Sequence, residues 1–212
     1  MKKAVFLFVF GSVFLAGCPK HEIIPAPTPK VELTGHLEGM INGTEVEFTQ
    51  NVSGYAVEAT KAKIILSPPN PSSAVYYAEM KSNESLVAVK IGMGSINWDA
   101  SASADGPALN QFNSFFTTPA NLEPLYSNGA LSGFEVTYRD GSGNIWKSEE
   151  TDPNDVIFTN VIQESDGSGD YSKFKCTFSC IVRRDQINPS PLPPTPLQMP
   201  LDNIVFEGWF QR

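Results

Sequence analysis

The side chains most capable of chemistry in this sequence form an acidic group. Glu149, Glu150, Asp152 and Asp155 lie close together in the chain, and Asn154 adds an amide oxygen. Carboxylate and amide oxygens are the ligands that Ca²⁺ prefers. The group lacks the alternating Asp and Asn positions, the following Gly and the distal Glu of a calcium loop. We therefore expect a solvated, charged turn here, with calcium binding as the alternative.

Nucleophilic catalysis has little support in the sequence. A Ser or Cys nucleophile needs a base, and His36 is the only histidine after the N-terminal region. It lies on the polar side of an expected strand, and no Gly-x-Ser-x-Gly motif is present. A hydrolase that uses two carboxylates needs them to face each other, which a sequence does not establish. We expect no catalytic residue, no metal site and no cofactor, and retain a carboxylate-dependent hydrolase as an alternative.

Two cysteines lie in a segment with clear period-two alternation. Cys176 and Cys180 share one parity with Phe174, Phe178 and Val182, while polar residues dominate the other parity. Along a continuous strand, the Cα atoms of the two cysteines are about 13 Å apart. A disulfide tolerates at most about 7 Å. We therefore predict two buried, reduced thiols and no disulfide.

Three tryptophans are the residues best suited to binding. Trp98, Trp146 and Trp209 could stack on a sugar or pack against a protein partner. Packing in the core is the ordinary role of such side chains, because a domain of this size must bury most of its aromatic surface. Both roles, ligand binding and core packing, remain open for these three residues.

The elements that position these residues are mainly strands. Asn42 and Gly43 join two alternating segments, which is a strong signal for a hairpin with a type I′ turn. Glycine-rich turns at residues 140–144 and 166–170 separate further strand pairs. The alternation places strands near residues 32–41, 46–48, 54–66, 74–81, 86–93, 134–139, 145–146, 156–163, 171–183 and 203–211.

One helix is expected among these strands. Asp105 is its predicted N-cap, Pro107 lies in its first turn, and Pro119 ends it. Residues 188–200 are rich in proline, so we expect them to cross the surface as polyproline II, with recruitment of a partner as the alternative. The sequence thus predicts a single all-β domain over residues 32–212. Its expected form is an antiparallel β-sandwich of nine or ten strands with one short helix, or alternatively a β-barrel.

Charge excludes one class of partner. The chain has 212 residues, 15 basic and 23 acidic side chains, and a formal net charge of -8. Nucleic-acid binding draws on clustered Lys and Arg, and the sequence contains no basic run. We therefore expect no nucleic-acid partner.

The N-terminus has the layout of a secretory signal. Lys2 and Lys3 precede an apolar run over residues 4–16, which is too short to span a bilayer. The run ends in Leu15-Ala16-Gly17-Cys18, and in this motif the chain resembles the bacterial lipoproteins. The resemblance implies cleavage before Cys18, a diacylglycerol thioether on its sulfur and acylation of its new amino group. Several acyl chains on one residue anchor a protein stably, whereas a single chain does not.

Removal of residues 1–17 takes away Lys2 and Lys3, which lowers the net charge from -8 to -10. Residues 18–31 contain alternating prolines, which favour a semi-rigid polyproline spacer between lipid and domain. We expect a lipid-anchored protein of the cell envelope, on the outer rather than the inner membrane. Its expected role is a binding module for a glycan, a peptide or an envelope partner, with an accessory subunit lacking its own ligand as an alternative.

We predict that replacement of Cys18 blocks maturation. Cys18→Ser removes the sulfur that would carry the diacylglycerol, so an unprocessed precursor should accumulate and take up no labelled fatty acid. Metabolic labelling followed by gel electrophoresis measures both effects. Cleavage and labelling of the variant at the wild-type level would contradict the resemblance.

Overall fold

The computed structural model of the chain describes residues 29–103, 105–127, 132–153, 155–184 and 197–212. The predicted signal sequence, Cys18 and most of the predicted spacer lie outside these residues, as does most of the proline-rich segment 188–200. No helix in the described part of the chain is long and apolar enough to cross a membrane.

Strands dominate the described chain, and every pairing between them is antiparallel. The strands are β1 (His36–Ile41), β2 (Thr44–Thr49), β3 (Tyr55–Ile64), β4 (Ser72–Ser82), β5 (Ala88–Trp98), β6 (Gly133–Arg139), β7 (Ile145–Lys147), β8 (Ile157–Asp166), β9 (Gly169–Arg184) and β10 (Leu197–Gln211). The helices are α2 (Leu109–Thr117) and α3 (Pro119–Leu122). The predicted all-β, antiparallel class and the expected number of strands are therefore confirmed.

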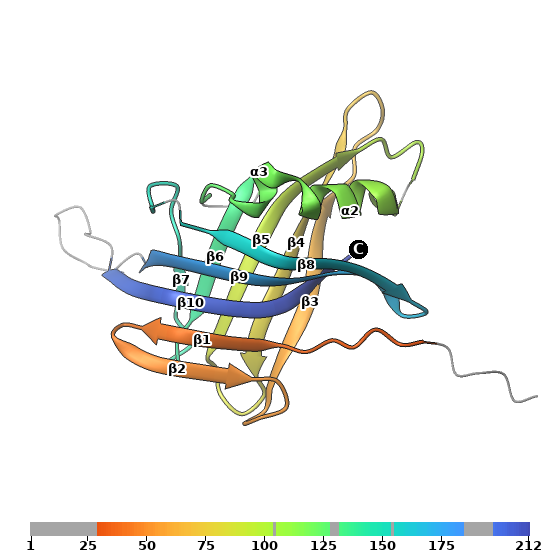
Figure 1. Cartoon of the computed structure of the whole chain (residues 1–212). Coiled ribbons are helices and arrows are strands. Elements are labelled where there is room, and N and C mark those ends of the chain that lie inside the picture. The colour runs from red at the N-terminus through yellow and green to blue at the C-terminus, as the bar shows by residue number, and fades with distance from the viewer. Residues whose placement is uncertain (1–28, 104, 128–131, 154, 185–196) are drawn as a thin grey trace, which may run out of the picture.

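All ten strands belong to one sheet. Its order is β2-β1-β10-β9-β7-β6-β5-β4-β3, and β8 also pairs with β9. The sheet curls into a half-barrel, so that a front half (β2, β1, β10, β9, β8) crosses a back half (β7, β6, β5, β4, β3) (Figure 1). The two layers of the expected sandwich are thus two parts of a single sheet, joined through the long strand β9.

The tight turns form as the sequence predicts. Asn42 and Gly43 have φ angles of 52° and 73°, which is the left-handed conformation that a type I′ hairpin requires. In the β6–β7 turn, Asp140 accepts hydrogen bonds from the side chains of Asn144 and Trp146. Burial acts to raise the pKa of Asp140, but these hydrogen bonds outweigh it and lower the pKa to about 2.

An aromatic core fills the space inside the curl. Phe210 is fully buried and stacks on Phe116 of α2 and on Phe174 of β9, with both centroid distances at 4.7 Å. Phe134 of the back half meets Phe158 and Phe178 of the front half edge to face. Helix α2 therefore closes one end of the half-barrel by inserting its phenylalanines between the two halves (Figure 1).

The helix begins later than predicted. Its N-cap is Ala108, whose backbone N–H donates to the side-chain oxygen of Gln111 at 2.9 Å. The predictions that Asp105 caps the helix and that Pro107 lies in its first turn are therefore wrong, because the helix begins only at Leu109. Pro119 ends α2 as expected, but it also occupies the first turn of the short helix α3.

The last strand begins earlier than predicted and contains a proline. β10 starts at Leu197, and Pro200 pairs with Ile181 of β9. The carbonyl oxygen of Pro200 accepts from the N–H of Asn42, on the side away from β9. In an antiparallel strand, the N–H and C=O of one residue point to the same neighbour. The missing amide hydrogen thus costs no bond to β9, and this part of the proline-rich segment is strand rather than polyproline II.

Strand β9 has the unbroken alternation of buried and less buried side chains on which the prediction of two reduced cysteines rests. Cys176 and Cys180 are 0% and 4% exposed, and both are free thiols on the inner face. Burial is the main cause that raises the pKa of both thiols above the ordinary value. They are therefore protonated side chains of the core.

We predict that Phe210→Ala lowers the free energy of unfolding by about 3–5 kcal/mol, because it leaves a cavity between helix and sheet. Urea denaturation measures the change. Ile145→Ala is the matched control, since Ile145 is 46% exposed and its truncation should cost no more than about 0.5 kcal/mol. A similar small cost at both positions would show that Phe210 does not join the helix to the sheet in solution.

Candidate functional site

The outer face of the front half carries three adjoining hollows. The first, the lysine hollow, has a volume of about 160 Å³ and is lined by Thr34, Asn160, Lys173, Phe174, Lys175, Glu207 and Gly208. The second, the acidic hollow, measures about 410 Å³ and is lined by Glu38, Gly39, Met40, Glu45, Val46, Glu47, Asn203 and Val205. The third, the N-terminal hollow, measures about 430 Å³ and is lined by Pro29, Lys30, Val31, Glu32, Glu164, Ser165 and Lys173.

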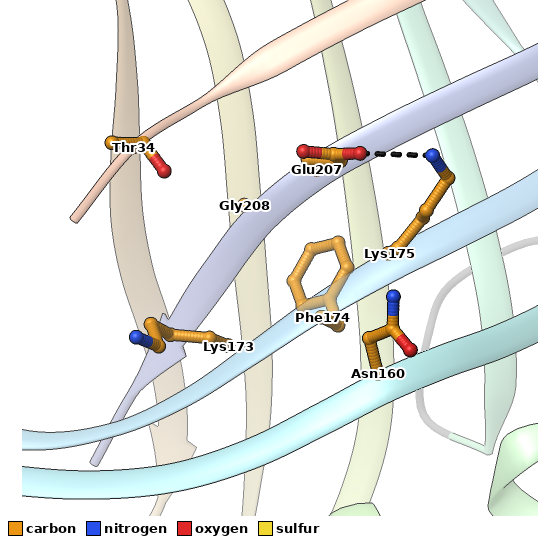
Figure 2. A pocket seen from close by; sticks show the side chains of 7 residues that line it. All are labelled: Thr34, Asn160, Lys173, Phe174, Lys175, Glu207 and Gly208. Atoms are coloured by element: carbon orange, nitrogen blue, oxygen red, sulfur yellow. Dashed lines mark hydrogen bonds and ion pairs between the residues drawn. The ribbon is translucent and has the colours of Figure 1, made fainter. Parts of the chain in front are cut away.

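Two ion pairs shape the lysine hollow. Lys175 Nζ lies 2.9 Å from Glu207 Oε1, and Lys173 Nζ lies 2.7 Å from Glu164 Oε2. Figure 2 shows the two lysines on opposite sides of Phe174, with Asn160 reaching in from β8. Hydrogen bonding and Coulomb attraction from Glu207 raise the pKa of Lys175, so this side chain stays charged.

The acidic hollow forms where two strands bulge together. The register of β1 and β10 shifts between Glu38 and Met40, and Asn203 adopts a φ of 52°. A Cβ atom at Gly39 would lie 2.9 Å from the carbonyl oxygen of Asn203 and 2.8 Å from the side chain of Ile204. Glycine, which has no Cβ, permits this close approach of β1 to β10 at the bulge.

Two carboxylates face each other at the rim of the acidic hollow. Glu38 lies directly opposite Glu47 in the register, and His36 Nε2 is 3.5 Å from Glu38 and 4.0 Å from Glu47. His36 Nδ1 lies 3.1 Å from the hydroxyl of Thr49. Paired acids are what the hydrolase alternative requires, but these two side chains are 54% and 69% exposed. Solvent screens groups that are this exposed, so the arrangement suits recognition of a positive charge better than proton transfer.

The N-terminal hollow lies where the chain enters the domain. The N–H of Val31 donates to Asp166 Oδ2 at 2.7 Å, and Gln50 Nε2 donates to the carbonyl oxygen of Leu33 at 3.1 Å. The side chain of Ser168 also bonds Asp166. The Ser168 hydrogen bond, followed by that of Val31, lowers the pKa of Asp166 to about 2. The entering chain is thus fixed to the tip of the β8–β9 hairpin.

None of the three tryptophans lines these hollows. Trp98, Trp146 and Trp209 are 4%, 7% and 7% exposed. The indole N–H of Trp98 donates to the carbonyl oxygen of Ser103, and that of Trp146 donates to Asp140. Their predicted use as stacking surfaces is corrected accordingly, because all three indole rings are packed into the fold and none is open to a ligand.

The acidic group at residues 149–155 serves the fold. Asp152 Oδ1 lies 2.9 Å from Arg183 Nη1, and the Asp152 side chain is fully buried. Glu149 lies 3.5 Å from Arg183, and Asp155 accepts from the N–H of Ser179. The expectation of a solvated turn is therefore wrong for Asp152. No group of three His, Cys, Asp or Glu side chains in the described residues is placed to hold a metal ion.

The residues that line the hollows form no motif in the sequence. Lys175 and Glu207 lie on the outward-facing side of β9 and β10. The alternation of polar and apolar residues in the sequence indicates this orientation. The neighbours of these two side chains across the sheet depend on long-range pairing, and the hollows themselves depend on bulges at Gly39, Asn160 and Asn203. The one available signal was the occurrence of Asn or Gly inside a strand pattern, which favours a bulge.

We predict that the amide of Val31 reports the ionisation of Asp166. The pKa of Asp166 in the folded protein is below the ordinary 3.8, so its hydrogen bonds stabilise the N-terminal segment above that pH and are lost as the pH falls toward 2. The Val31 amide resonance should therefore titrate with a midpoint near pH 2. In Asp166→Asn this titration should vanish. A wild-type midpoint near 3.8, or an unchanged titration in the variant, would mean that the contact does not form in solution.

Comparison with known proteins gives no relative. No protein-family model matches the chain, and neither a curated protein nor a solved structure does.

Proposed function

We propose that this protein is a lipid-anchored, non-catalytic module of the bacterial cell envelope, which binds an extended polypeptide segment of another envelope protein. The binding surface is the outer face of the front half, across the acidic and lysine hollows. The anchor is the lipid on Cys18 implied by the signal-sequence motif. The hollows carry the proposal for binding.

The spacing of the two hollows supports an extended ligand. Val205 and Glu207 are two residues apart on β10, and one lines each hollow. Alternate side chains of an extended polypeptide are about 6.8 Å apart, which is the spacing of residues two apart on β10. A segment running along β10 can thus place one side chain in each hollow. This match of spacing is the observation that carries the proposal.

The charges of the hollows indicate what those side chains are. The acidic hollow presents Glu38, Glu45 and Glu47 around the apolar side chains of Met40 and Val205, so it suits a Lys or Arg with its long apolar stem. In the lysine hollow, Lys175 and Glu207 already neutralise each other. A polar, uncharged side chain fits there without leaving an unpaired charge.

A glycan fits this surface less well. Sugar rings are commonly held by stacking on exposed aromatic side chains. Phe174 is the only aromatic residue that lines any of the three hollows, and it is 5% exposed. The polar and charged rim favours a peptide.

Site-specific photo-crosslinking in cells tests this function. A benzophenone amino acid in place of Met40, which is 38% exposed, should form an adduct with an envelope polypeptide. The same amino acid in place of Ile145, on the back half, is the matched control and should give no such adduct. Reversal of charge at the rim by Glu38→Lys and Glu47→Lys should reduce the adduct roughly tenfold, as expected when about 1.4 kcal/mol of attraction is lost.

Both glutamates are exposed, so the double variant should keep its melting temperature, and this is measured in parallel. Adducts of equal yield at positions 40 and 145 would contradict the proposal. An adduct with cell-wall glycan at position 40 would move the function to sugar binding.

A further inference from the structure

The end of β3 and the loop that follows it, residues 65–71, expose three consecutive aliphatic side chains. Ile64, Ile65 and Leu66 are 51%, 55% and 43% exposed, and no other run of three large apolar residues in the described chain is exposed in this way. Figure 1 shows this loop projecting beyond the body of the sheet. Exposed apolar clusters of this kind mark a contact with an apolar partner or a membrane.

The loop is held in a defined shape. The N–H of Leu66 donates to Ser72 Oγ at 2.9 Å, and the N–H of Asn70 donates to the carbonyl oxygen of Ser67 at 3.2 Å. Pro68, Pro69 and Pro71 restrict the backbone further. The exposure of the three side chains is therefore a property of an ordered hairpin.

Basic side chains gather beside this loop in a chain that is acidic overall. Lys63 donates to the carbonyl oxygen of Asp105, and Arg212 donates to that of Pro107. The pKa of Lys61 is lowered, mainly by burial and then by the positive charges of Lys63 and Arg212. Lys61 therefore lies near both of these basic side chains. This end of the domain thus holds a cluster of cations, only partly balanced by Asp105 and by Asp170, which pairs with Arg212.

The N-terminal segment departs beside the β8–β9 hairpin, at some distance from the β3–β4 loop (Figure 1). Arg212 Nε lies 2.6 Å from Asp170 at the start of β9, and Asp166, at the end of β8 before the turn, holds the amide of Val31. Arg212 thus lies between the basic cluster beside the β3–β4 loop and the hairpin that holds Val31. We call this side of the domain, from the β3–β4 loop to the β8–β9 hairpin, the anchor end, because the chain toward Cys18 leaves from it.

We propose that the anchor end lies on the lipid surface, with Ile64, Ile65 and Leu66 inserted at the interface and Lys61, Lys63 and Arg212 facing anionic headgroups. This inference rests on the proposed lipid anchor at Cys18. Apolar side chains flanked by basic ones are the combination that binds an anionic membrane surface. The spacer limits how far the domain can leave the bilayer, while the anchor end sets which way the domain faces.

A fluorescent probe at position 65 tests the inference on the full-length lipidated protein. Ile65→Cys is labelled with the environment-sensitive dye NBD, since Cys176 and Cys180 are buried and the sulfur of Cys18 is occupied by lipid. Ile145→Cys is the matched control at 46% exposure. By the strand register, Ile145 is level with Ala56, about 27 Å from Ile64 along β3.

The protein is reconstituted on vesicles of phosphatidylethanolamine and phosphatidylglycerol. At position 65 we expect a blue shift of the emission and loss of intensity when the vesicles contain a doxyl-labelled lipid. At position 145 we expect neither. Alanine at Lys61 and Lys63 should reduce the shift at position 65 and leave flotation with the vesicles unchanged.

Equal emission at positions 65 and 145 on protein that floats with the vesicles would overturn the inference and leave the anchor intact. A blue shift without vesicles that grows with protein concentration would also overturn it, because the loop would then bind a second copy. Failure of the full-length protein to float would overturn the anchor itself, and with it this inference.

Discussion

The buried ion pair between Arg183 and Asp152 lies at the point where the two halves of the sheet are most weakly joined. Between β7 and β9 the backbone pairing consists of Lys147 opposite Arg183 alone. A fully buried carboxylate is costly unless a charged partner is in place, so Asp152 requires Arg183 at this position. The guanidinium of Arg184 adds a contact 4.9 Å from the ring centroid of Trp146. The facing halves and the aromatic core between them depend on this junction, because the sheet passes from one half to the other between β7 and β9.

Local patterns in the sequence identified the strands and turns, although β5 and β10 are longer than predicted. Alternation of side chains identifies the faces of β9, and Asn42 with Gly43 identifies the first hairpin, because both signals depend only on neighbouring residues. Pro119 identified the end of α2 correctly, because proline cannot continue a helix. The start of the helix was missed because its N-cap is Ala108, a residue type that does not mark a helix start in a sequence.

Local patterns in the sequence did not predict the candidate site. The acidic hollow needs Gly39 on β1 to meet Asn203 on β10, and these residues are far apart in the chain. The acidic group at residues 149–155 looked solvated because its partner Arg183 is equally remote. The tryptophans looked available for binding because alternation alone does not show which loops and side chains cover an indole ring, as Ser103 and Arg184 do here. In each case the missing information was the partner across the fold.

The pairing of β1 with β10 sets the order in which the molecule can be completed. β1 and β2 precede every other strand, yet β1 pairs only with β2 and with β10, the last strand of the chain. The N-terminal hairpin therefore has no sheet to join until the C-terminal strand is free to pair, and closing such long-range contacts is slow. In the proposed export, the C-terminal strand crosses the membrane last, so the N-terminal hairpin stays without its partner β10 until the whole domain has crossed.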